Sequence, residues 1–123
     1  MDRDRYRVEV LSLAEELARA DAEENAVWGV YARTEKLIAI LKFRLGYETS
    51  GVFTKLPDAS DQAKLLKDAG VLLSRASEEI AGGRLVESIG TLRKARNDLR
   101  SYLTERRKSA TRAARKPRAK PAT

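Results

Sequence analysis

The chain contains no cysteine and no histidine among its 123 residues. The absence of cysteine excludes disulfide bonds and thiolate metal sites. The absence of histidine removes the commonest general base and the commonest transition-metal ligand. Serine, threonine and tyrosine are present, but without histidine or cysteine they cannot complete a catalytic triad or dyad of the usual kind. We therefore expect a protein that is not an enzyme and that needs no metal or other cofactor.

Long hydrophobic runs are also absent. The longest unbroken apolar stretch runs only from Leu37 to Leu41, whereas a membrane span needs about 20 residues. The first residues are mostly charged, and no apolar region typical of a secretory signal follows them. The sequence therefore predicts an intracellular protein, cytoplasmic or nucleoid-associated, or nuclear if the host is a eukaryote.

Charge is plentiful but unevenly placed. The chain carries 25 basic and 18 acidic residues, a net charge of +7. Eight of the basic residues and one of the acidic residues lie in positions 105–123, so positions 1–104 carry no net charge. A neutral body with a cationic C-terminal segment is typical of proteins that bind polyanions.

The first 45 residues hold one continuous apolar pattern with a spacing of four and three residues. This period of 3.5 is the coiled-coil spacing. It predicts either one long helix from about Asp2 to Leu45 or two collinear helices that break near residues 21–25, with Asp21 as a cap. Unbroken phase favours the single helix. The positions of the pattern are Tyr6, Val10, Leu13, Leu17, Ala20, Glu24, Val27, Tyr31, Thr34, Ile38, Leu41 and Leu45.

The second half of the body predicts a helical hairpin. Gly46 is placed to end the preceding helix, and residues 47–59 carry turn chemistry. A helix is expected to begin near Ser60 or Asp61 and to end at Gly82-Gly83. Another follows from about Arg84 to Lys108, and two glycines between helices indicate an antiparallel pair. We thus expect an all-α fold, with a helical domain at 1–108 and a basic unstructured tail at 109–123.

The tail is built from alanine, arginine, lysine, proline, serine and threonine, and it has no large apolar residue that could form a core. Its composition is similar to the basic tails of linker histones and to extensions of ribosomal proteins, a likeness of composition alone. Lysine and arginine bind phosphate backbones by releasing counterions, without reading the base sequence. The residues expected to contact phosphate are Arg100, Arg106, Arg107, Lys108, Arg112, Arg115, Lys116, Arg118 and Lys120.

Other interpretations of these basic residues stay open. The tail can serve as a solubilising or targeting segment, or it can bind a membrane surface or an acidic protein. Arg93 and Arg96 are expected to pair with acids of a neighbouring helix rather than to bind phosphate. Tyr102 is expected at the rim of the core rather than as a platform for stacking on a base.

A second apolar strip lies on the far side of the N-terminal helical region. It consists of Trp28, Ala32, Ala39 and Phe43. A helix that is apolar on two faces must bury both. We expect this strip to form a protein interface in a homodimer. The alternative is that the loop carrying Val52, Phe53 and Leu56 folds back over it.

Together these features predict a non-catalytic protein that associates with nucleic acid, DNA or RNA, through phosphate contacts of its basic C-terminal end. A ribonucleoprotein component and a chromosome-associated protein both fit this expectation. The alternative function is a helical adaptor or scaffold that docks a protein partner through Trp28 and Phe43, with the tail as a solubiliser or targeting segment.

Overall fold

Four α-helices make up most of the part of the chain that the computed structural model describes, which comprises residues 3–20, 23–46, 57 and 60–119, with side chains up to Ser109. No strand occurs within these residues, so the predicted all-α fold is confirmed. In chain order the helices are α1 (Arg3–Arg19), α2 (Glu24–Arg44), α3 (Gln62–Ala81) and α4 (Leu85–Ala119).

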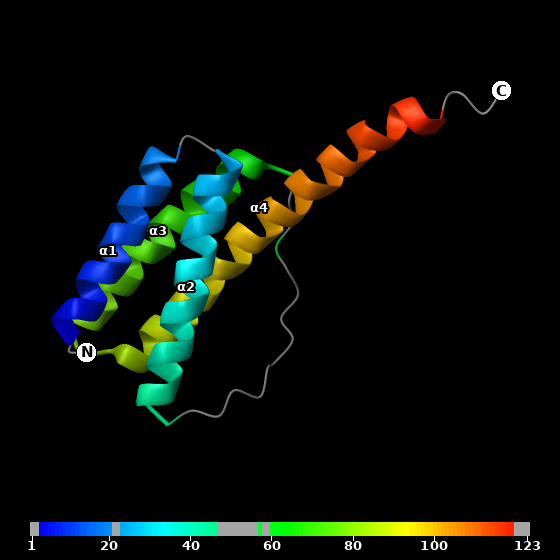
Figure 1. The fold of residues 1–123 in the computed structure, drawn as a ribbon. Helices are drawn as coiled ribbons and strands as arrows, with labels where there is room; N and C mark the ends of the chain where they lie inside the picture. Colours follow the sequence, from blue (N-terminus) through cyan, green and yellow to red (C-terminus); the bar gives the residue numbers. More distant parts are fainter. Residues whose placement is uncertain (1–2, 21–22, 47–56, 58–59, 120–123) are drawn as a thin grey trace.

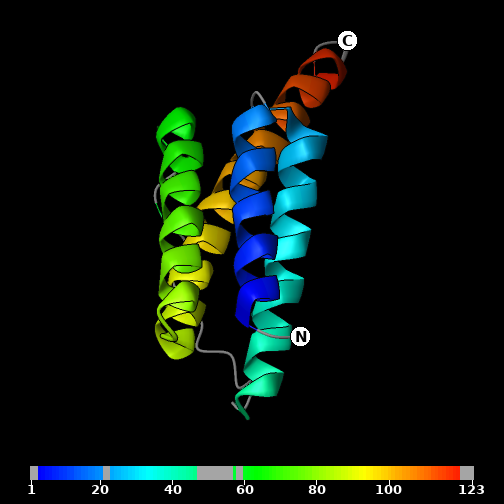
Figure 2. The same ribbon diagram turned by 90° about the vertical axis from the view of Figure 1, so that its left-hand side faces the viewer.

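The helices form a four-membered bundle in which each one packs against two neighbours (Figures 1 and 2). α1 contacts α2 and α3, and α4 contacts the same two helices. Every neighbouring pair is antiparallel, while α2 and α3 run in the same direction on opposite corners (Figure 1). This topology needs one long connection, between α2 and α3. The hydroxyl of Ser101 on α4 donates a hydrogen bond to the backbone oxygen of Pro57 in that connection, at 2.6 Å.

The core lies along the centre of the bundle and receives one apolar stripe from each helix. Burying a large apolar side chain contributes about 1.5–3 kcal/mol, so these stripes supply most of the driving force for folding. The largest side chains buried almost completely are those of Leu13, Leu41, Leu73, Ile80, Leu92, Leu99 and Tyr102.

The N-terminal region is an antiparallel hairpin, so the prediction of one long helix or two collinear helices is wrong in its geometry. The expected break near residues 21–25 does occur, because α1 ends at Arg19 and α2 begins at Glu24. Glu23, rather than the predicted Asp21, caps α2: its carboxylate accepts hydrogen bonds from the backbone N–H groups of Asn25 and Ala26 at 3.1 and 2.8 Å. Asp21 itself lies outside the described residues.

The period-3.5 pattern survives this break because both helices turn their stripes towards the same core. Nine of its twelve positions are buried, from Tyr6 to Leu41. Arg33 of α2 joins the two helices on their outer side through ion pairs with Glu9 and Glu16 of α1. Burial of the Arg33 guanidinium lowers its pKa, but the two carboxylates outweigh this and raise it. The seam predicted as a coiled coil is therefore the inner face of an intramolecular hairpin.

The predicted C-terminal hairpin is confirmed. Asp61 caps α3 by accepting a hydrogen bond from the backbone N–H of Lys64 at 3.0 Å. Gly83 adopts a φ of 80°, a left-handed conformation that glycine tolerates best, and reverses the chain into α4. The buried Glu79 carboxylate accepts a hydrogen bond from the Thr91 hydroxyl at 2.5 Å and so links the two helices beside this turn.

The segment predicted to be an unstructured tail continues α4 instead. The helix runs to Ala119, eleven residues beyond the expected end at Lys108. Alanine and arginine are strong helix formers, and extending an existing helix avoids the cost of nucleating a new one. The domain boundary expected between 108 and 109 therefore falls inside a continuous helix, and the expected extended backbone around Pro117 is not found. Residues 120–123 lie outside the described part.

Candidate nucleic-acid interface

The C-terminal part of α4 extends past the ends of the other helices (Figure 1). α4 has 35 residues, whereas α1, α2 and α3 have 17, 21 and 20. At 1.5 Å per residue, α4 is about 52 Å long and α3 about 30 Å. We call residues 104–119 the α4 extension, which carries seven of the 25 basic residues of the sequence away from the bundle (Figure 1).

The described cations at the base of the α4 extension are exposed. Arg106, Arg107 and Lys108 belong to the extension, Arg100 lies one turn before it, and all four residues are exposed. Four further predicted phosphate contacts lie in the helical backbone of the extension, where side chains are not described: Arg112, Arg115, Lys116 and Arg118. Lys120, the last of the predicted set, lies outside the described residues.

Tyr102 is a core residue and not a stacking platform. Its side chain is only 1% exposed, which agrees with the expected position at the core and leaves no ring face for a base. The guanidinium of Arg106 lies 5.8 Å from the centre of the Tyr102 ring, within the range of a cation–π contact. The extension therefore offers charge without an exposed aromatic ring among its described residues.

A second group of cations lies where α4 packs against α2. Arg96 donates a hydrogen bond to Glu35 of α2 at 2.9 Å, so the predicted ion pair of this residue is confirmed. Arg93 is half-buried in the same seam, and within the described residues no acid forms an ion pair with it. Lys42 of α2 lies near both: burial, and then the charges of Arg93 and Arg96, lower its pKa against the opposing effect of Glu35.

These two groups form a positively charged path on α4. Arg93, Arg96 and Arg100 follow one another at helical spacing of three and four residues, and Arg107 comes two turns later. At the α2–α4 seam the cations of Arg93, Arg96 and Lys42 lie near the carboxylate of Glu35, which engages Arg96. An anion at the α2–α4 seam would therefore meet an excess of positive charge.

The described acidic residues do not gather into a metal site. Within the described residues, no group of three or more acidic side chains is placed to hold a metal ion. Among the carboxylates that the structure describes, Asp98 of α4 has a strongly shifted pKa: burial and then the charge of Asp68 on α3 raise the value to about 6. None of the helices that the structure describes is both long enough and apolar enough to cross a membrane.

The predicted interface strip of α2 is exposed over its full length. Trp28 is 53% exposed and Phe43 is 86% exposed, and Ala32 and Ala39 between them are also exposed. We call these four residues the α2 apolar strip. The Trp28 ring packs against Tyr31 of the same helix, with ring centres 5.4 Å apart. The predicted alternative cover for this strip, the loop residues Val52, Phe53 and Leu56, lies outside the described residues.

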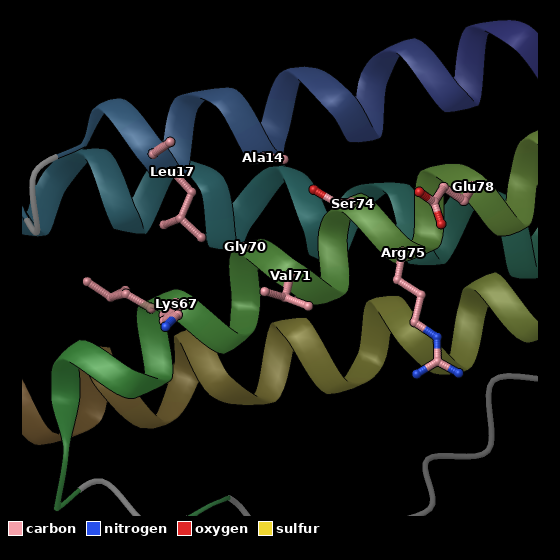
Figure 3. Close-up of a pocket in the computed structure, with 10 residues that line it drawn as sticks. Ala14, Leu17, Lys67, Gly70, Val71, Ser74, Arg75 and Glu78 are labelled. Atoms are coloured by element: carbon pink, nitrogen blue, oxygen red, sulfur yellow. The ribbon is translucent and has the colours of Figure 1, made fainter.

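A groove that the sequence did not predict lies between α1 and α3. It has a volume of about 850 Å³. Figure 3 shows Ala14 and Leu17 on the α1 side of it and the backbone of Gly70 on the α3 side, while Lys67, Arg75 and Glu78 lie along α3. Ala14 and Gly70 leave space between the two helices, and this can be recognised only when the pairing of α1 with α3 is known.

Comparison with protein-family models, with curated proteins and with solved structures found no match to this chain.

Proposed function

We propose that this is a non-catalytic nucleic-acid-associated protein, a ribonucleoprotein component or a chromosome-associated protein, that binds phosphate backbones through the end of α4. The observation that carries the proposal is the α4 extension: a helix that leaves the bundle and holds nearly all of the net charge of the chain. The bundle serves as the support for this cationic helix.

The proposed binding relies on charge density rather than on base contacts. From Arg100 to Ala119 the helix rises by about 28 Å. Duplex DNA carries one negative charge per about 1.7 Å of its axis, so a helix of this length spans many phosphates. Because Tyr102 is buried, the described residues of α4 supply no exposed ring for base stacking. The proposal is therefore backbone recognition with little sequence preference, for DNA or RNA alike.

The proposal includes self-association and location. A homodimer would place two α4 extensions on one particle, and the exposed α2 apolar strip supports this. A protein that coats or organises nucleic acid would reside where the nucleic acid is, in the cytoplasm or nucleoid, or in the nucleus of a eukaryote.

Truncation at Ser109 tests the proposal. Deleting residues 109–123 removes five cations from the α4 extension and its end, and is expected to remove most of the affinity for a short duplex. For the full chain, log K should fall with log salt with a slope of about −4 to −7, as expected for five to eight phosphate contacts. Equal binding by the truncated chain, or a flat salt profile, would disprove the proposal.

A matched pair of variants separates local charge from net charge. Arg100→Gln with Lys108→Gln and Lys64→Gln with Lys67→Gln each remove two exposed cations, the first pair from α4 and the second from α3. Fluorescence anisotropy with a labelled duplex should show a loss of about tenfold or more for the α4 pair and a much smaller loss for the α3 pair. Equal losses would indicate that only overall charge matters.

The second candidate function is a helical adaptor or scaffold. The exposure of Trp28 and Phe43 favours it, because large aromatic residues in the open are typical of protein interfaces. In that case the α4 extension acts as a solubiliser, and substituting Trp28 and Phe43 with alanine should abolish partner binding while neutralising the α4 cations should not.

A further inference from the structure

The α2 apolar strip has the same pattern in both directions along the helix. A large residue at 28 and a small one at 32 are followed, after seven residues, by a small one at 39 and a large one at 43. The pattern is symmetric about the point between Glu35 and Lys36. An antiparallel second copy of α2, related by a two-fold axis through that point, would place Ala32 opposite Ala39 of the copy and Trp28 level with Phe43 of the copy.

The strip also points away from the bundle. At 100° per residue, its four members cluster within about 60° on the helix, and the buried residues of α2 are centred on the opposite side. A partner can therefore approach α2 without displacing α1 or α4. An antiparallel copy meets no other helix of the bundle first.

The order of sizes suits a pair of crossed helices. Two helices that cross are closest at the crossing point and diverge on either side. Ala32 and Ala39 lie near the centre of the strip and allow close approach, whereas Trp28 and Phe43 lie about 11 Å from the centre and can fill the widening gap. A strip with large residues in the middle would keep the two copies apart.

Gly29 gives a second, independent indication. It lies inside α2 and is exposed, and a Cβ placed on it would meet no atom of the chain within 4 Å. Glycine weakens a helix interior relative to alanine, and nothing within the described fold requires it here. In the two-fold arrangement, Phe43 of the second copy lies on the same side of the helix pair as Gly29 and about 1.5 Å from it along the helix axis. The missing side chain would leave room for that ring.

We propose that the α2 apolar strip binds a second copy of this chain in an antiparallel two-fold arrangement with this register. The inference rests on the proposed self-association and is independent of nucleic-acid binding. The two exposed aromatic side chains present about 300 Å² per chain and so about 600 Å² in a dimer. The exposed neighbours on the same face must supply the rest of the roughly 1,000 Å² that specific complexes bury. We expect a dissociation constant in the micromolar range.

Engineered cysteines test the register, because the chain has none of its own. Ala32→Cys and Ala39→Cys variants are prepared separately, mixed and oxidised. The mixture should form the 32–39 heterodisulfide. Each variant alone should form little dimer, because identical positions lie seven residues, or about 10 Å, apart along the axis, too far for a disulfide. Mixing Ala32→Cys with Ala63→Cys, an exposed position on α3, provides the control.

Sedimentation over 1–200 μM tests the association itself. Gly29→Ala and Phe43→Ala should each weaken the dimer about tenfold or more, and circular dichroism should show unchanged helicity because both positions are exposed. A monomer at every concentration would overturn both the self-association and this inference. A dimer that forms 32–32 and 39–39 disulfides instead would indicate a parallel pair and overturn the inference alone. Affinity for a short duplex, measured beside these, reports separately on the α4 proposal.

Discussion

Asp98 is a partly buried carboxylate on α4 that lies near the carboxylate of Asp68 on α3. Burial, and then this like charge, raise the pKa of Asp98 to about 6. In the unfolded chain the same group titrates near 3.9. The folded state therefore holds this proton more tightly, so the contribution of Asp98 to stability is greatest below about pH 4 and is lost as pH rises through about 6.

Replacing Asp98 with asparagine should remove this loss. Because the group is partly exposed, we expect Asp98→Asn to raise the free energy of unfolding at pH 7 by about 1–2 kcal/mol, less than the full shift would give. Urea denaturation at pH 4 and at pH 7 measures the effect, which should be small at pH 4. Asp68→Asn should give a smaller gain. A variant as sensitive to pH between 4 and 6 as the parent would contradict the assignment.

Local residues also explain which features of the site could be read from sequence. The exposure of Trp28 and Phe43 followed from their distance from the 3.5-residue pattern, and the burial of Tyr102 followed from the apolar stripe of its helix. The partner of Arg96 could be expected only as an acid on a neighbouring helix, because Glu35 is 61 residues away in the sequence. The groove between α1 and α3 was not foreseen for the same reason.

At the scale of single elements, α4 differs most from its expectation. The composition of residues 109–123 indicates a segment that does not fold alone, yet the backbone of 109–119 is helical as part of α4. A segment that does not fold alone can still be helical here, because nucleation is the costly step of helix formation and the bundle has already nucleated α4. Closely spaced cations oppose the helix, and a bound polyanion would relieve that repulsion.

The helicity of this segment should therefore depend on its attachment. A peptide of residues 109–123 alone is expected to be mostly non-helical by circular dichroism in dilute buffer. The full chain should show the signal of about ten more helical residues than a chain ending at Lys108, and inorganic polyphosphate should increase the difference. A full chain with no excess signal would contradict the continuous helix.

At the scale of the whole molecule, the direction of the N-terminal helices could not be read from the apolar pattern. The pattern from Tyr6 to Leu41 identifies the buried faces correctly, but a helix that turns back keeps those faces on one core as well as a straight one does. The structure adds two features that the pattern does not contain: the Glu23 cap, which is local, and the pairing of Arg33 with Glu9 and Glu16, which is not. The pairing of α3 with α4 was predictable because two glycines leave only a tight turn.

A dimer with two α4 extensions should bind long nucleic acids by avidity. Weakening the dimer with Phe43→Ala is expected to lower the affinity for a duplex of about 60 base pairs by tenfold or more, since the second extension gains from a high effective concentration. Affinity for a duplex too short for two extensions should not change. Gel-shift titration at one salt concentration compares the two, and equal effects on both lengths would contradict the avidity model.

The antiparallel packing of neighbouring helices within the bundle also places the start of α1 and the α4 extension at opposite ends of the molecule. The start of α1 lies at the same end of the bundle as the Gly82-Gly83 turn, and the α4 extension leaves from the opposite end (Figure 1). A surface anchor or fluorescent probe attached near Arg3 would thus stand a full bundle length from the cationic helix. If the protein is immobilised in that orientation, every molecule presents its α4 extension to a nucleic acid in solution.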